Sequence, residues 1–486
     1  MRKTDLTHLT PGSRTALAPI VSLLATLAAN AQPLPNLFPF PNSSGFVATA
    51  SLNNQPINLS GPFFQSLGTN GRSCSSCHVA AEGWSISAAE VKARFELTQG
   101  LDPIFRANDG SNCDHNIDTS TLAGRRSAYS LLLNKGLIRI ALPLPANAEF
   151  SVVSVSNPYG CGDLATVSMY RRPLPSTNLR FLSTVMWDGR ESSTQTGTLK
   201  IAPGTNPEDL RADLAHQSVD ATTGHAQGTR VLTPEQQQAI VNFEMGLATA
   251  QIYDYGAGLL NANGASGGPL AIAAQTMPAF YVGINDPLGG NPRGVPFTAV
   301  IFNLFDAWMP QPSLHGHSDQ GGGDAQLRRA SIARGQALFN SKPIQITEVA
   351  GLNDDLNQAV IPGTCGTCHD SPNIGNHSVS APLNIGVADV NSPLNVSYLP
   401  VITLRNNATH EIKITTDPGR AMITGLWKDI GRLKGPILRG LASRAPYFHN
   451  GSADSLGDAV DFYDKRFKIG FTAQEREDLI AFLSTL

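Results

Sequence analysis

The sequence is poor in charged residues and in long hydrophobic runs. Charged residues make up 15% of its 486 residues, and the formal net charge is −3. Nothing in this composition favours nucleic acid or another strongly charged partner. Beyond the N-terminus, no apolar stretch has the length of a membrane-spanning helix. We therefore expect no nucleic-acid partner and no stable membrane insertion.

The N-terminus has the pattern of a secretory signal. Positive charge at Arg2, Lys3 and Arg14 precedes an apolar core over residues 16–28, and Ala29-Asn30-Ala31 forms a cleavage site before Gln32. An uncleaved anchor is the alternative, but the apolar run is short for a membrane span. The pattern predicts a signal peptide over residues 1–31 and export to the periplasm.

Two five-residue motifs organise the rest of the chain. They are Cys74-Ser75-Ser76-Cys77-His78 and Cys365-Gly366-Thr367-Cys368-His369. C-x-x-C-H is the attachment signature of c-type haem, in which the histidine becomes the proximal iron ligand. A zinc site built from two C-x-x-C pairs is the alternative, but these pairs lie too far apart for a zinc ribbon. The motifs predict two covalently bound haem c groups, with His78 and His369 on the irons.

The other two cysteines, Cys113 and Cys161, lie in loop-like sequence. In an oxidising compartment we expect one structural disulfide between them, with two free thiols as the alternative.

The chain divides into two haem regions. Plentiful proline and glycine (33 and 45 residues) predict long irregular connections between short helices. Capping boxes at Thr233/Gln236 and Thr472/Glu475 predict the helices that close the two regions. We expect a mainly α fold of two cytochrome c-like domains, with a few short strands such as residues 138–142. The predicted segments are 32–55 (extended lead-in), 56–255 (N-terminal haem domain), 256–325 (connecting region) and 326–486 (C-terminal haem domain).

A weak internal repeat accompanies the haem motifs. In each half a turn precedes a helix that has apolar residues at positions i and i+4 and a polar residue at i+7, all on one helical face. The first copy is Met186-Trp187-Asp188-Gly189-Arg190 with Leu210, Leu214 and Gln217, and the second is Phe448-His449-Asn450-Gly451-Ser452 with Leu456, Val460 and Tyr463.

The two repeat copies differ at the polar position. A tyrosine is a competent haem ligand, so His369 and Tyr463 are one candidate pair of ligands that would close the C-terminal haem. The alternative for Tyr463 is an ordinary core tyrosine with a satisfied hydroxyl. A glutamine amide hydrogen-bonds well but ligates iron poorly, so Gln217 predicts an open N-terminal haem.

These features resemble the bacterial dihaem cytochrome c peroxidase and MauG family. The matching residues are the two C-x-x-C-H motifs, Met186 to Arg190, Asn384-Ile385-Gly386, Pro418-Gly419-Arg420, Leu438-Arg439 and Pro446 to Ser452. The resemblance implies that peroxide reacts at the His78 haem, that the His369 haem transfers electrons, and that Trp187 bridges the two. It also implies Tyr463 as an axial ligand, as in MauG-type members, and a Ca²⁺ ion between the domains.

The chain departs from the family at the distal site. Gln217 matches the family's glutamine, but the position of the acid/base glutamate falls within residues 224–227, which contain no carboxylate. Gln227 cannot shuttle a proton, whereas the imidazole of His225 can. His225 is alternatively an iron ligand, as are His216 and His115, or a plain turn residue.

The leading hypothesis is a periplasmic dihaem oxidoreductase that reacts with hydrogen peroxide at the N-terminal haem and shares oxidising equivalents with the C-terminal haem. Its expected partners are hydrogen peroxide and a small redox protein or an organic electron donor. An anionic tyrosinate ligand lowers the potential of the second iron, so oxidation of a protein or organic substrate is a further expectation. The alternatives are an electron carrier with two closed haems and oxygenase chemistry at an open N-terminal haem.

Overall fold

The computed structural model describes residues 32–192, 207–310, 323–379 and 381–486, so the predicted signal peptide lies outside the described residues. Ten α-helices are found there: α1 Ala88–Thr98, α2 Leu122–Ala128, α3 Ser130–Lys135, α4 Pro207–Gly224, α5 Pro234–Met245, α6 Pro269–Ala274, α7 Asp324–Ser341, α8 Ala421–Thr424, α9 Leu456–Phe467 and α10 Ala473–Leu483. The same residues form eleven strands: β1 Phe40–Pro41, β2 Gly45–Ser51, β3 Ile138–Pro143, β4 Phe150–Ser156, β5 Thr166–Arg171, β6 Leu247–Asp254, β7 Gly258–Leu259, β8 Ile344–Thr347, β9 Val360–Gly363, β10 Val401–Asn406 and β11 Ile412–Thr415.

The strands correct the expectation of a mainly α fold. They build four small antiparallel sheets, in the orders β1-β2-β6-β7, β11-β10-β4, β3-β5 and β8-β9. Helices and strands are therefore mixed, and only the short strand expected near residue 138 was foreseen. Two of the pairings, β2 with β6 and β4 with β10, join strands far apart in the sequence, which local sequence patterns do not reveal.

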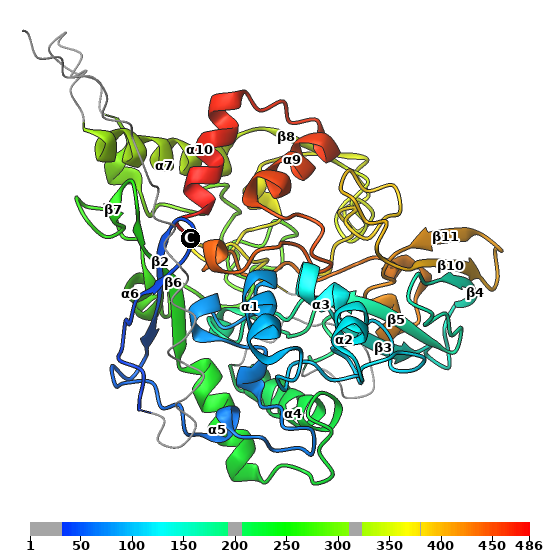
Figure 1. The fold of residues 1–486 in the computed structure, drawn as a ribbon. Coiled ribbons are helices and arrows are strands. Elements are labelled where there is room, and N and C mark those ends of the chain that lie inside the picture. Colours follow the sequence, from blue (N-terminus) through cyan, green and yellow to red (C-terminus); the bar gives the residue numbers. More distant parts are fainter. Residues whose placement is uncertain (1–31, 193–206, 311–322, 380) are drawn as a thin grey trace, which may run out of the picture. The chain divides into compact units, whose positions relative to one another are not determined.

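One of these sheets joins the two halves of the chain. In Figure 1, β4 from the first half lies beside β10 and β11 from the second half. Ile402 of β10 is paired with Val155 of β4, and both face a cluster of apolar side chains that also includes Phe150 and Met422. Residues Pro33–Leu486 accordingly form one unit.

The helices that close the two haem regions begin where the capping boxes predict. Thr233 caps α5 and Thr472 caps α10, and the backbone N–H of each threonine donates the reciprocal hydrogen bond to the side chain of the third helical residue. Helix α10 packs on α7 at Gly335, where a Cβ atom would lie 1.9 Å from the backbone oxygen of Asp478. Only glycine permits so close a contact, and the two helices lie side by side in Figure 1.

The residues expected to connect the two haem regions are partly buried in the core. Phe302, Phe305 and Trp308 pack with Phe339 of α7 and Phe482 of α10. A second cluster joins Leu179 and Phe181 with Ile374 and Ile437 of the second half. The domain boundaries given above stay a prediction.

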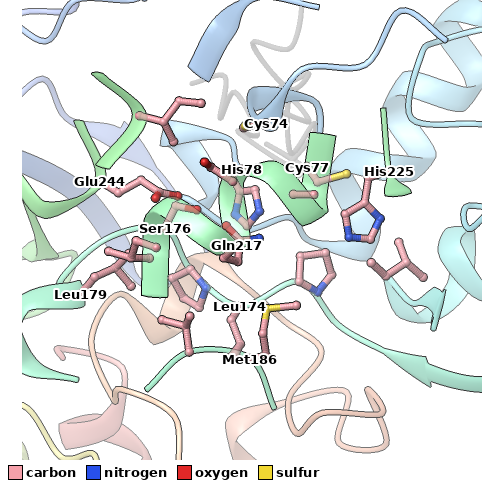
Figure 2. Close-up of a pocket in the computed structure, with 18 of the residues that line it drawn as sticks. Cys74, Cys77, His78, Leu174, Ser176, Leu179, Met186, Gln217, His225 and Glu244 are labelled. Carbon is pink, nitrogen blue, oxygen red and sulfur yellow. The ribbon is translucent and has the colours of Figure 1, made fainter. Parts of the chain in front are cut away.

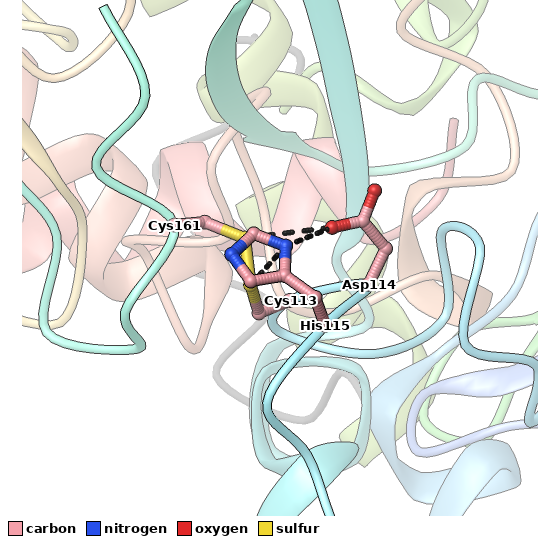
Figure 3. A group of neighbouring side chains, drawn as sticks. All are labelled: Cys113, Asp114, His115 and Cys161. Carbon is pink, nitrogen blue, oxygen red and sulfur yellow. Dashed lines mark hydrogen bonds and ion pairs between the residues drawn. A yellow bond between two sulfur atoms is a disulfide. The ribbon is translucent and has the colours of Figure 1, made fainter.

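The expected disulfide is confirmed. Cys113 and Cys161 are bonded, and their Cα atoms lie 5.6 Å apart. Figure 3 shows the exposed side chains of Asp114 and His115 beside the disulfide, 2.7 Å from each other. Because both sulfur atoms are used in the disulfide, this group has no thiolate to offer a metal ion.

Within the described parts of the chain, none of the helices combines the length and apolar character that crossing a membrane requires.

Candidate functional site

The first C-x-x-C-H motif opens into a large cavity. Residues Cys74–Ser76 form a 3₁₀-helix, and a capping box between Ser73 and Ser76 caps its N-terminus. Cys74, Cys77 and His78 all line the cavity, which encloses about 1520 Å³ including its opening to solvent. Figure 2 shows these three side chains together with Gln217, His225 and Glu244.

The second motif repeats this arrangement. Residues Cys365–Thr367 form a 3₁₀-helix with a capping box between Thr364 and Thr367. Cys365, Cys368 and His369 line a second cavity of about 1800 Å³, also counted with its opening to solvent.

Both motif histidines are held in the same orientation. The Nδ1 atom of His78 lies 3.0 Å from the carbonyl oxygen of Trp84, and that of His369 lies 2.6 Å from the carbonyl oxygen of Gly375. A carbonyl can only accept, so Nδ1 carries the proton and Nε2 is left to bind a metal. Burial lowers the pKa of both imidazoles to about 4, which keeps them in the neutral, ligating form.

The four motif cysteines fit attachment to a haem. None of them forms a disulfide, although the other two cysteines do. Burial raises the pKa of the Cys74, Cys365 and Cys368 thiols to about 12, so they are neutral thiols directed at apolar cavities. Two thiols and one imidazole nitrogen at the wall of a cavity are the donors that c-type haem requires.

The two cavities share a wall. Six residues line both cavities and form this wall: Arg172, Pro173, Leu174, Pro175, Trp187 and Lys434. The indole of Trp187 donates a 2.7 Å hydrogen bond from Nε1 to the carbonyl oxygen of Arg172, and its ring meets the His449 ring edge-on at 6.1 Å. The structure therefore places Trp187 between the two cavities.

Buried ion pairs fix the turn that carries Trp187. Arg171 donates to Asp188 at 2.5 Å and to Asp417 at 2.7 and 2.8 Å. Arg420 donates to the carbonyl oxygens of Asp188 and Gly189. Burial would raise the pKa of Asp188, but the charges of Arg171 and its neighbours outweigh burial and hold it at about 2. The Pro418-Gly419-Arg420 motif thus anchors the Trp187 turn to the second half of the chain.

The turns of the internal repeat have the same geometry. Met186 and Phe448 have positive φ angles of 69° and 65°, and both turns are closed by an antiparallel bridge, between Val185 and Glu191 and between Tyr447 and Ala453. This finding confirms the repeat at the level of the backbone.

Each turn precedes a helix that covers one cavity. Leu214 and Gln217 of α4 line the first cavity, while Val460 and Tyr463 of α9 line the second. Burial raises the pKa of the Tyr463 hydroxyl, and no hydrogen-bond partner for this hydroxyl is found in the described part of the chain. Tyr463 thus lines the second cavity as the repeat predicts, and its role as a ligand stays a prediction.

His225 lines the first cavity as part of a charged triad. Its Nδ1 donates a short hydrogen bond to one carboxylate oxygen of Asp109, and Arg72 donates a short hydrogen bond to the other. Burial would raise the pKa of Asp109, but His225 and Arg72 outweigh it and lower that pKa. The carboxylate orients the imidazole, so its Nε2 atom is available for proton transfer.

Three other polar candidates do not line either cavity. Gln227 is exposed, with φ 54°, in the turn that follows α4. His216 is exposed and contacts Glu191 at 2.7 Å, and His115 lies beside the disulfide. The structure therefore brings Gln217 and His225 together in the first cavity but leaves Gln227, His216 and His115 outside.

A carboxyl group in the first cavity was missed by the sequence analysis. Glu244 of α5 lines the cavity, and one of its carboxyl oxygens is buried without a hydrogen-bond partner within the described residues. Burial raises its pKa to about 8, although a hydrogen bond from Ser176 opposes this shift. No motif marks Glu244, since its only sequence signal is a charged residue at the buried end of an amphipathic helix.

Within the described residues, none of the side-chain groups that could hold a metal ion suits the expected calcium ion. Calcium takes only oxygen ligands, whereas each group of three or more potential metal ligands within the described residues contains a histidine. These groups are Cys113, Asp114, His115 and Cys161; Glu191, His216 and Asp220; and Asp286, Asp370 and His377. Calcium binding stays a prediction.

Comparisons with known proteins agree with the motifs. The chain is 29% identical over 187 residues to cytochrome-c peroxidase IdrP1 of Pseudomonas sp. (strain SCT), which is 34% of this chain and 42% of that protein. It is 31% identical over 135 residues to cytochrome-c peroxidase IdrP2 of Denitromonas iodatirespirans, which is 26% of this chain and 36% of that protein. The matches thus span less than half of the relatives' own length. No family model matches the chain.

Two solved structures are similar over 94% of both chains. One is a MauG-like protein associated with microbial copper homeostasis (16% identity, TM-score 0.37), and the other is the Y463M variant of the dihaem peroxidase BthA from Burkholderia thailandensis E264 (14% identity, TM-score 0.30). TM-scores this low carry no argument about the fold of this chain.

The two cavities and their donor sets fit a protein that holds two haem groups. The curated relatives are all cytochrome-c peroxidases, in agreement with the resemblance to such peroxidases that the sequence motifs predict.

Proposed function

We propose that the chain is a periplasmic oxidoreductase with two covalent haem c groups, which reduces hydrogen peroxide at the first cavity. One observation carries this proposal: a cavity with a C-x-x-C-H motif, Gln217 and an aspartate-supported His225 is separated by Trp187 from a second cavity of the same kind. The named relatives, all cytochrome-c peroxidases, support the peroxidase class.

In this proposal Cys74, Cys77 and His78 would hold a haem, which would supply redox chemistry for the reduction of peroxide. The reaction is H₂O₂ + 2 H⁺ + 2 e⁻ → 2 H₂O, and the protein must deliver protons to the departing oxygen. His225 takes a proton from one peroxide oxygen and returns it to the other through Nε2, while Asp109 holds the imidazole in place. Gln217 orients the peroxide by hydrogen bonding.

The second cavity has a different role. His369 and Tyr463 both line this cavity and would hold the iron of its haem. Trp187 lies in the wall between the cavities, and we assign it the passage of electrons or holes between the haems. A small redox protein or an organic donor would then supply the two electrons.

The test is stopped-flow absorbance of the ferric protein mixed with stoichiometric hydrogen peroxide, together with electron paramagnetic resonance of the resting state. One high-spin and one low-spin haem with a rapid spectral change are expected. Two low-spin haems that do not react, even after partial reduction, would instead identify an electron carrier.

His225→Ala tests the acid/base assignment. General acid–base catalysis contributes roughly 10²- to 10⁴-fold, so the reaction with peroxide should slow by about that factor while the resting spectrum stays the same. His216→Ala is the matched control, because His216 is exposed and does not line the cavity. A change from low-spin to high-spin haem in His225→Ala would make His225 an iron ligand and refute the open site.

A further inference from the structure

The wall between the two cavities contains a buried lysine without a counter-charge. Lys434 is 5% exposed and lines both cavities. Its backbone N–H donates a 2.8 Å hydrogen bond to the carbonyl oxygen of Trp187. Within the described residues its ammonium group has no ion pair and no hydrogen bond, and burial lowers its pKa to about 8.

Two other buried cations of the cavity linings also lack an anionic partner. Arg172 also lines both cavities and donates only to the carbonyl oxygens of Lys135, Ile86 and Arg444. Arg444 lines the second cavity and donates to the carbonyl oxygen of Ile437. Burial lowers the pKa of both guanidinium groups to about 10, and the two charges repel each other.

Three buried cations thus line the cavities, Lys434 and Arg172 in the wall that both share and Arg444 in the second, and no carboxylate forms an ion pair with any of them in the described part of the chain. Glu82 is the acidic residue that acts on Arg172, but burial raises its own pKa to about 7. A buried charge without a partner is strongly unfavourable. We therefore expect a bound group of opposite charge to pair with these cations. Each haem carries two propionate carboxylates, and these are the anions that enter the cavities.

We propose that the ammonium group of Lys434 forms ion pairs with a propionate of each haem and thereby links the two haems electrostatically. This inference rests on the proposed function only in requiring a haem in both cavities. Pairing cancels the negative charge of a propionate. Without the cation, that charge stabilises the ferric state more than the ferrous state, which lowers the reduction potential of the nearby iron.

The test compares three variants of the haem-loaded protein. Lys434→Met removes the charge but retains the length of the side chain, and Lys434→Arg keeps the charge. Lys428→Met is the matched control, since Lys428 is exposed and lies outside both cavities. The two midpoint potentials are measured by spectroelectrochemical titration, and haem content by the pyridine haemochrome assay.

Lys434→Met is expected to lower both midpoint potentials with two haems still bound, whereas Lys434→Arg and Lys428→Met stay near the wild-type values. A shift in only one potential, or in neither, overturns the shared ion pair. Lys434→Gln replaces the methionine variant if the latter yields no soluble, haem-loaded protein.

The outcome is independent of peroxide turnover. A wild-type protein that binds two haems but does not react with peroxide refutes the proposed function and leaves the potentials to decide the role of Lys434.

Discussion

Replacing Glu244 with glutamine should stabilise the protein at neutral and alkaline pH. The carboxyl group of Glu244 lies in the first cavity, where one of its oxygens has no partner among the described residues. Glutamine has nearly the same shape and stays neutral, so the substitution removes the cost of ionisation without leaving a void.

The magnitude follows from the pKa. Burial raises that of Glu244 from 4.5 to about 8. Below pH 4.5 the group is protonated in both the folded and the unfolded states and contributes no difference. Between pH 4.5 and 8 the unfolded state releases the proton more readily, so the folded protein loses stability as the pH rises. Each pH unit in this window is worth about 1.4 kcal/mol, which gives roughly 3 kcal/mol at pH 7 and a plateau of about 5 kcal/mol above pH 8.

The assay is urea denaturation of the haem-loaded wild type and Glu244→Gln at pH 5, 6, 7, 8 and 9. The stability difference between the two proteins should grow with pH and level off above pH 8. Glu235→Gln is the control, because Glu235 lies at the exposed start of the same helix and its pKa is lowered rather than raised. A difference that does not change with pH would refute the reasoning, because it would mean that Glu244 ionises in the folded protein as easily as in the unfolded chain.

Three further outcomes are expected. Tyr463→Phe should convert one low-spin haem to high-spin in the optical and electron paramagnetic resonance spectra, and an unchanged spectrum removes Tyr463 as a ligand. Trp187→Phe should slow the spectral equilibration between the haems after mixing with peroxide and cost about 1–3 kcal/mol in stability, since the carbonyl oxygen of Arg172 loses its donor. Replacing both Cys113 and Cys161 with alanine should lower the free energy of unfolding by about 4 kcal/mol for a loop of this size, as measured by denaturation; an equal stability would show that the loop is already ordered in the unfolded chain.

The sequence reveals the site better than it reveals the fold. The C-x-x-C-H motifs and the helices carrying Gln217 and Tyr463 are local patterns with fixed spacing, and each of them lines a cavity in the structure. The pairing of β4 with β10 joins strands from opposite halves of the chain, and no local pattern records such a pairing.

Three residues of the cavities could not be identified from the sequence, because their positions depend on contacts between distant parts of the chain. Asp109 meets His225 across 116 positions of the sequence, so the triad cannot be recognised from spacing. Glu244 and Lys434 are charged residues that patterns assign to the surface, and only the packing around the cavities shows that they are buried.

The shared wall also determines when the first haem pocket can close during folding. Lys434 and Ile437, from the last part of the chain, help to line the cavity that begins at Cys74. A nascent chain that has emerged only to residue 400 therefore cannot complete the pocket of its first haem, although both cysteines and the histidine are already present. Every other residue that lines this cavity lies at or before Glu244 in the sequence, so the wall that Lys434 and Ile437 supply is the last part of the cavity to form as the chain is made.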